Sequence, residues 1–187
     1  PISYALSIID KLDTLVGFYL INEKPTSSKD PFALRRAAIG LLRTIIENNL
    51  VVKLRDLIDY STKAYLDQGV KQLNNEVGKD LLIFFRERIK NILKERKIRT
   101  DIIEASISSH LSDNFLELYK KTIIMNKFIS KDLGKNAVST YKRASNILGQ
   151  EKLTSKNGPD AVLFKYEEEK ELFERINEIR KAFTLKE

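Results

Sequence analysis

Apolar residues recur at intervals of three and four along most of the chain, with polar residues between them. This spacing is typical of helices that bury one face, and no alternating pattern is long enough for a strand. The sequence therefore predicts an all-α fold, a helical bundle. The expected helices cover residues 3–20, 30–47, 53–67, 79–96, a short stretch from 100, 113–128, 133–148 and 161–183.

The helix expected at 30–47 has a distinct start signal. Asp30 is suited to the N-cap position, where its carboxylate would accept a hydrogen bond from a first-turn amide. Pro31 would then occupy the first helical position, where no backbone donor is required. We therefore expect this helix to begin at Asp30.

Two arginines, Arg35 and Arg36, lie close to that start. A cation there meets the positive end of the helix dipole, at a cost of about 0.3–1 kcal/mol. A compensating contact is therefore expected, and two explanations remain open. The arginines either pair with carboxylates such as Asp10 or Asp13 of a neighbouring helix, or contact an RNA phosphate.

The helix expected at 79–96 combines an apolar face with a basic one. At about 100° per residue its leucines, isoleucines and Phe85 form one arc, and cations follow an adjoining face. Phe84 lies outside the arc and either stacks on an unpaired base or makes a second packing contact. The basic candidates for RNA contact are Arg86, Lys90, Lys94, Lys97 and Arg99, with Lys142 and Arg143 as an extension or as solvated side chains.

Composition narrows the classes of protein to consider. The chain has 187 residues, is 42% hydrophobic and contains no cysteine, which excludes disulfides and thiolate metal sites. No apolar run approaches the roughly 20 residues that span a bilayer, so we expect a cytoplasmic protein with no membrane partner. The net charge of +7 favours a polyanionic partner only weakly. Position is more informative, since residues 86–99 hold seven basic and two acidic residues.

Catalytic chemistry is sparse in this sequence. The one histidine, His110, falls at the end of an expected helix, where a solvated structural role is favoured over a ligand role. Neither a histidine-based triad nor a multi-histidine metal site can be assembled. Asp10 and Asp13 lie one helical turn apart, a spacing that suits a metal, although such pairs more often meet arginines or solvent. We therefore expect no catalytic residue and no metal ligand.

Three stretches carry a family resemblance. The segments "DKLDTLVGFYLINEKPTSSKDPFALRRAAIGLLRTI" (10–45), "LLIFFRERIKNILKERKIRTDIIEA" (81–105) and "YKRASNIL" (141–148) resemble the beta subunit of the bacterial two-subunit glycyl-tRNA synthetase. The later segments resemble its C-terminal anticodon-binding domain, of the DALR type found in arginyl-tRNA synthetases. Asn22 and Ser27 stand where this family usually has glycines. Asparagine tolerates a left-handed backbone, and serine does so less readily.

The resemblance implies three regions. Residues 1–24 would be the C-terminal end of an HD-like region, 25–75 a connecting helical segment, and 76–187 the helical anticodon-binding domain. Asp10 would be a structural remnant of the final HD-like helix, because the matching histidines would lie upstream. The residues expected at the junction between regions are Asp10, Asp13, Asp30, Arg35 and Arg36. The chain begins at Pro1 with residues that already fit a helix, so we expect a fragment of a longer protein.

The resemblance also implies a function. In this alpha2beta2 enzyme the alpha subunit holds the catalytic site for glycine and ATP, and the beta subunit binds tRNA(Gly). The fragment would then need no cofactor, while the complete enzyme uses ATP and Mg, and its partners would be tRNA(Gly) and the alpha subunit, not DNA. The alternatives are a helical scaffold whose basic surface meets an acidic protein and, less favoured, an independent HD-type hydrolase.

Overall fold

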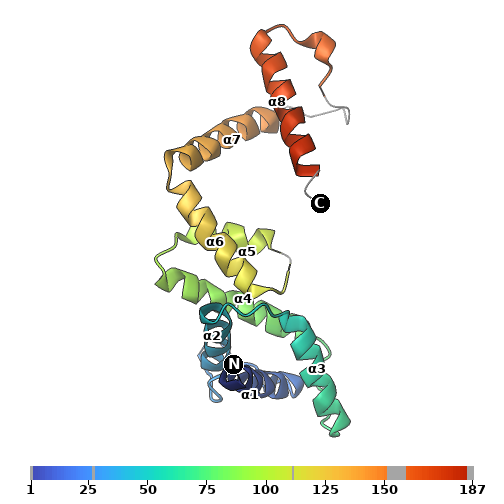
Figure 1. Ribbon diagram of the computed structural model, residues 1–187. Helices are drawn as coiled ribbons and strands as arrows, with labels where there is room; N and C mark the ends of the chain where they lie inside the picture. The colour runs from blue at the N-terminus through green and yellow to red at the C-terminus, as the bar shows by residue number, and fades with distance from the viewer. Residues whose placement is uncertain (1, 27, 111, 151–158, 185–187) are drawn as a thin grey trace. The chain divides into compact units, whose positions relative to one another are not determined.

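The computed structural model describes residues 2–26, 28–110, 112–150 and 159–184. Within these ranges the chain forms helices and connections and has no strand, which confirms the all-α prediction (Figure 1). The helices are α1 (Ile2–Leu20), α2 (Leu34–Glu47), α3 (Leu54–Asp67), α4 (Val77–Glu95), α5 (Thr100–Ser109), α6 (Phe115–Ile129), α7 (Asp132–Gln150) and α8 (Glu167–Thr184), with a 3-10 turn at Ala161–Leu163. None of these described helices is long and apolar enough to cross a membrane.

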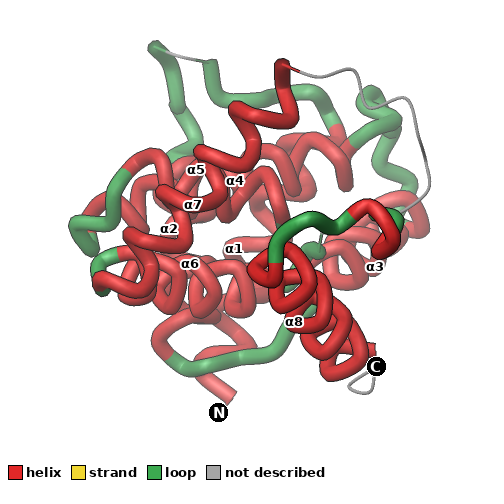
Figure 2. The backbone as a smooth tube through the Cα atoms, turned by 90° about the horizontal axis from the view of Figure 1, so that it is seen from above, coloured by secondary structure: helices red, strands yellow, loops and turns green. Residues whose placement is uncertain are grey.

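Two compact units make up the chain, and they divide between Val138 and Ser139, within α7. In the first unit α4 is the central helix, because it packs against α1, α2, α3, α5 and α6 (Figures 1 and 2). Its apolar arc is buried as predicted, and Phe85, Ile89 and Leu93 are fully buried. The helices before and after residue 76 share this core, and the assignment of residues 1–24, 25–75 and 76–187 to three regions stays a prediction.

The start of α2 differs from the predicted one. The helix begins at Leu34, after Ala33 in a left-handed conformation with φ 53°, and Pro31 lies in the preceding turn. Asp30 nevertheless caps the helix from outside, since its carboxylate accepts hydrogen bonds from the amides of Leu34 (2.8 Å) and Arg35 (3.1 Å). A tertiary contact accompanies the turn. The ring of Phe32 stacks on Phe18 of α1 with centroids 4.0 Å apart.

Asp30→Ala is expected to lower the free energy of unfolding by about 0.5–2 kcal/mol, because two first-turn amides lose their acceptor. Asp30→Asn keeps one side-chain acceptor and should lose less. Thermal melting of the two variants beside the wild type measures both effects. If Asp30→Ala melts at the wild-type temperature, the cap contributes nothing to stability.

The connection between α1 and α2 and the connection between α3 and α4 both contact the start of α4. Asn22 is left-handed with φ 64°, a conformation that asparagine tolerates, and Ser27 lies outside the described residues. The carboxylate of Asp80, in the first turn of α4, accepts hydrogen bonds from Lys24 Nζ (2.6 Å) and Asn74 Nδ2 (2.9 Å). The hydrogen bond from Lys24 lowers the pKa of Asp80. One carboxylate therefore holds both connections against α4.

The start of α6 also differs from the prediction, which placed it at Asp113. Asn114 is the N-cap residue, and its side chain accepts a hydrogen bond from the amide of Glu117 (3.1 Å). The Asp113 carboxylate instead accepts a hydrogen bond from the amide of Arg55 (2.9 Å) in the first turn of α3. Asp113 thus caps a helix that precedes it by more than fifty residues.

In the second unit the last helix is shorter than the predicted 161–183. Asp160 caps the 3-10 turn by accepting a hydrogen bond from the amide of Val162 (3.0 Å), and α8 begins only at Glu167. The Glu169 carboxylate accepts hydrogen bonds from the amides of Lys165 (2.7 Å) and Tyr166 (3.1 Å). These two contacts stabilise a separate start for α8, so the predicted single helix is interrupted.

Candidate nucleic-acid interface

Lys90 is the member of the predicted basic face that the structure ties most firmly to its own chain. Its Nζ forms ion pairs with Glu87 (2.9 Å) on α4 and Glu104 (3.1 Å) on α5, and its side chain is only 18% exposed. These carboxylates raise the pKa of Lys90. Arg86, one turn earlier, is half-buried. Lys90 therefore joins α4 to α5, and much of its charge is matched within the fold.

Lys94 and Lys97, at the end of α4, are exposed and form no ion pair with the described residues. Lys97 follows the helix in a left-handed conformation with φ 58°. Arg99, two residues later, pairs with Asp101, with Nη2 and Oδ2 2.6 Å apart. The cations that remain most available to a ligand thus gather at the C-terminal end of α4.

Phe84 is half-buried between two side chains. Its ring centroid lies 5.6 Å from that of Tyr19 on α1, and the Arg88 guanidinium lies over the ring at 5.0 Å. Packing is therefore sufficient to explain the position of Phe84, and stacking on an RNA base stays a prediction.

Lys142 and Arg143 belong to the second unit, in the C-terminal part of α7. Both side chains are exposed, and neither forms an ion pair within the described ranges. Their role as an extension of the basic face stays a prediction.

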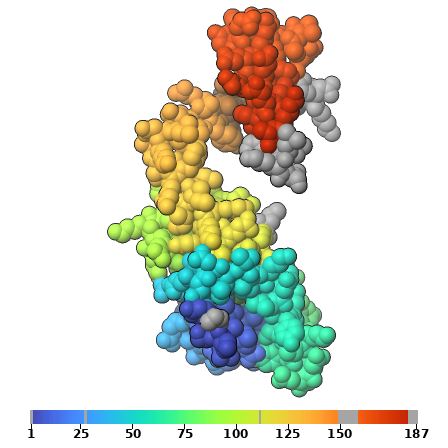
Figure 3. Space-filling model, viewed as in Figure 1, coloured from blue at the N-terminus to red at the C-terminus, as the bar shows by residue number. Residues whose placement is uncertain are grey.

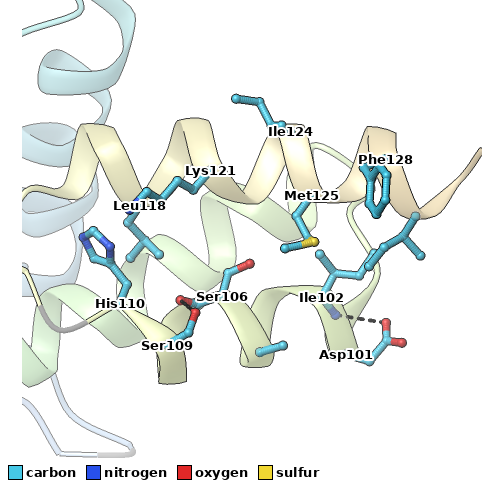
Figure 4. Close-up of a pocket in the computed structure, with 12 residues that line it drawn as sticks. Asp101, Ile102, Ser106, Ser109, His110, Leu118, Lys121, Ile124, Met125 and Phe128 are labelled. Atoms are coloured by element: carbon cyan, nitrogen blue, oxygen red, sulfur yellow. Dashed lines mark hydrogen bonds between the residues drawn. The ribbon is translucent and has the colours of Figure 1, made fainter. Parts of the chain in front are cut away.

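An apolar groove lies between α5 and α6 (Figure 4). It has a volume of about 670 Å³, and Ile102 faces Met125 and Phe128 across it. His110 lies at one end and is only 6% exposed, so the prediction of a solvated histidine is wrong. The reason is that the start of α6 folds over the end of α5, and Nε2 of His110 donates a hydrogen bond to the Asn114 carbonyl (3.2 Å).

A second groove was missed by the sequence reasoning. It has a volume of about 490 Å³ and lies between the end of α4 and α6, and we call it the α4–α6 groove. Its lining residues are Arg96, Ile98, Tyr119, Lys120, Ile123, Ile124, Asn126 and Lys127. A helical-wheel argument treats each helix alone and cannot bring Arg96 next to α6. The available signal was the spacing of Lys120 and Lys127, which are seven residues apart and therefore share a helix face.

Comparison with known proteins decides the family. The family described as "Glycyl-tRNA synthetase beta subunit" matches residues 1–108, which is more than half of the chain. The chain belongs to the glycyl-tRNA synthetase beta subunit family. The matched range contains α1 to α4 and almost all of α5.

Individual relatives extend the similarity beyond residue 108. The Glycine–tRNA ligase beta subunit of Rickettsia africae is 41% identical over 175 residues, covering 93% of this chain and 24% of the relative. The beta subunit of Ruegeria sp. is 42% identical over 150 residues, covering 80% of this chain and 20% of the relative. The beta subunit of Cereibacter sphaeroides is 40% identical over 150 residues, covering 80% of this chain and 22% of the relative. The chain thus spans about a fifth to a quarter of the length of these relatives.

The acidic residues of α1 do not pair with Arg35. Its guanidinium instead lies 3.7 Å from the Asp30 carboxylate and donates a hydrogen bond to the Thr26 carbonyl. Arg35 therefore pairs with a carboxylate, as one of the two explanations held, but that carboxylate belongs to Asp30 and not to Asp10 or Asp13. The reason is that the turn before α2 folds Asp30 back onto the helix start, where it reaches Arg35 first.

Asp13 has a different partner. Its carboxylate accepts a hydrogen bond from the Tyr65 hydroxyl on α3 (2.9 Å), and burial together with this bond raises the pKa of Tyr65 to about 12. Asp10 and Arg36 are exposed. In the part of the chain that the structure describes, no three histidine, cysteine or acidic residues are placed to hold a metal ion. The role of Asp10, Asp13, Asp30, Arg35 and Arg36 at a junction between regions stays a prediction.

Proposed function

We propose that this chain is a tRNA-binding part of a glycine–tRNA ligase beta subunit. Membership of the family is the observation that carries the proposal, and the relatives named above are all Glycine–tRNA ligase beta subunits. The ligand is tRNA(Gly), and the chain supports the attachment of glycine catalysed with the alpha subunit. ATP and Mg serve that reaction in the complete enzyme, in the cytoplasm, and the chain itself contributes no catalytic group.

Within this proposal the first 24 residues end an HD-like region, and residues 76–187 form a DALR-type anticodon-binding domain. Lys94 and Lys97 contact the tRNA backbone, since they are exposed and unpaired among the described residues. Arg86 and Arg99 add positive charge on the first unit, and Lys142 and Arg143 are further RNA contacts on the second unit. Lys90 contributes less, because two carboxylates already neutralise it. Phe84 packs against Tyr19 and adds a stacking face only if the Arg88 guanidinium moves away.

The salt dependence of tRNA binding tests the proposal. Each phosphate contact contributes about 0.7–0.9 to the slope of log affinity against log salt, so Lys94→Gln, Lys97→Gln should flatten the slope by roughly 1.5. Because phosphates carry no sequence information, the loss should be equal for tRNA(Gly) and for other tRNAs. Lys90→Gln should lower the melting temperature and leave the slope nearly unchanged. Filter binding across a salt series measures the slopes.

Lys63→Gln is the control, because Lys63 is exposed and lies on α3, whereas Lys94 and Lys97 lie at the C-terminal end of α4. Its slope should equal that of the wild type. Wild-type protein that shows no preference for tRNA(Gly) over other tRNAs at physiological salt would contradict the proposed function. That result would instead support the scaffold alternative.

A further inference from the structure

We propose that the α4–α6 groove binds a single-stranded segment of RNA, an inference that rests on the proposed tRNA-binding function and locates one contact for it. The groove lies within the first unit, where the surface of α6 is visible in yellow (Figure 3). It adds residues that no helix-by-helix reading of the sequence selected. Its charge, spacing and apolar floor each support RNA as the ligand.

The cations of this groove form no ion pair with any residue that the structure describes. Arg96, Lys120 and Lys127 line it, its lining contains no acidic residue, and none of the three forms an ion pair with another described residue. Neighbouring cations differ, since Lys121 pairs with Glu117 (2.7 Å) and Arg43 with Glu95 (2.6 Å). Unmatched positive charge that converges on a concave surface is suited to a phosphodiester backbone.

The spacing of the cations fits an extended strand. Lys120 and Lys127 share one face of α6 and are seven residues apart, which corresponds to roughly 10 Å along the helix axis. Arg96 lies on the opposite side of the groove, just beyond the last residue of α4. A strand that follows the groove would therefore meet cations on both sides.

The floor of the groove favours unpaired bases over a duplex. Ile98 is buried beneath it, and the half-buried ring of Tyr119 lines it. Unpaired bases stack on such rings, whereas a duplex offers mainly its backbone. Asn126 also lines the groove, and its side-chain amide forms no hydrogen bond with the described residues. That amide can read the edge of one base. The groove between α5 and α6 lacks these features, because its Lys121 is paired and its walls are apolar.

Fluorescence anisotropy with the full-length protein tests this proposal. The probes are a labelled ten-nucleotide single-stranded RNA and labelled tRNA(Gly), each titrated over a salt series. Lys120→Gln, Lys127→Gln should flatten the salt slope for the short RNA by about 1.4, because two contacts to a single strand are lost. Tyr119→Leu retains apolar packing and should weaken binding of the short RNA roughly tenfold through lost stacking. Melting curves verify that each variant is folded.

The matched control is Lys63→Gln, Lys71→Gln, which removes the same charge from exposed lysines outside the groove. An unchanged slope for the groove variant would overturn the proposal, even where wild-type protein prefers tRNA(Gly) and the proposed function stands. Groove-dependent binding of the short RNA without preference for tRNA(Gly) would support the groove and contradict the proposed function. If poly-glutamate binding depends on the groove lysines as strongly as RNA binding, and Tyr119→Leu has no effect, the groove is an acidic-protein site and the proposal is wrong.

Discussion

Phe85→Ala is expected to remove about 3–5 kcal/mol of the free energy of unfolding, a large share of the roughly 5–15 kcal/mol typical of a domain. Phe85 is fully buried at the centre of α4, and its ring centroid lies 5.9 Å from that of Phe115 on α6. Because α4 packs against every other helix from α1 to α6, the cavity would lie where the first unit has its common core. RNA binding should fall together with the folded fraction.

Ile83→Ala provides the control for this prediction. Ile83 lies two residues earlier on the same helix and is 53% exposed, so its truncation changes helix propensity similarly without opening a buried cavity. We expect it to change stability by less than about 1 kcal/mol. Chemical denaturation of both variants at equal protein concentration measures the difference. Equal midpoints would show that Phe85 does not belong to the core that determines stability.

Gly134→Ala is expected to destabilise the connection between α6 and α7 by about 1–3 kcal/mol. A Cβ atom at this position would overlap the Phe128 carbonyl oxygen and would lie 2.8 Å from the Ile129 Cα atom. These are backbone atoms, and a rotamer change cannot relieve the overlap. Either the last turn of α6 or the first turn of α7 must open. Hydrogen exchange at residues 128–135 should therefore become faster, and the melting temperature should fall.

Gly78→Ala makes the same substitution near the start of α4 and should have the opposite sign. A Cβ atom at Gly78 would meet only the Arg55 and Asp59 side chains, at 3.4 and 3.5 Å. Alanine is favoured over glycine in a helix by up to about 1 kcal/mol, so this variant should be neutral or more stable. If both variants lose equal stability, the close approach of Phe128 is not the cause.

The all-α fold and the buried face of α4 followed from the sequence alone. Leu81, Phe85 and Ile89 occur at helical spacing, and all three are fully buried. Such spacing is a local property, because every residue of a helix projects in a direction set by its neighbours in the chain. The segments that resemble the glycyl-tRNA synthetase beta subunit could also be recognised from the sequence, and they indicated the family without any knowledge of the structure.

Helix starts and charge partners depended on tertiary structure. Asp113 reads as the opening of its own helix, yet its carboxylate caps α3 because the fold brings the two segments together. Lys90 reads in the sequence as a candidate for RNA contact, yet Glu104 on α5 pairs with it. A carboxylate accepts from whichever donor lies nearest in space, and sequence distance places no limit on that choice.

The candidate RNA-binding surface also followed partly from the sequence and partly from the tertiary structure. The sequence by itself determined an all-α chain with a basic stretch at residues 86–99 and the family to which it belongs. Only the tertiary structure decided which of those cations remain available, and it alone placed Arg96 beside Lys120 and Lys127 in one groove. The charge of a residue is known from its type alone, but a concave surface forms only when separate helices pack. The residues that line such a surface therefore cannot be derived from the periodicity of any one helix.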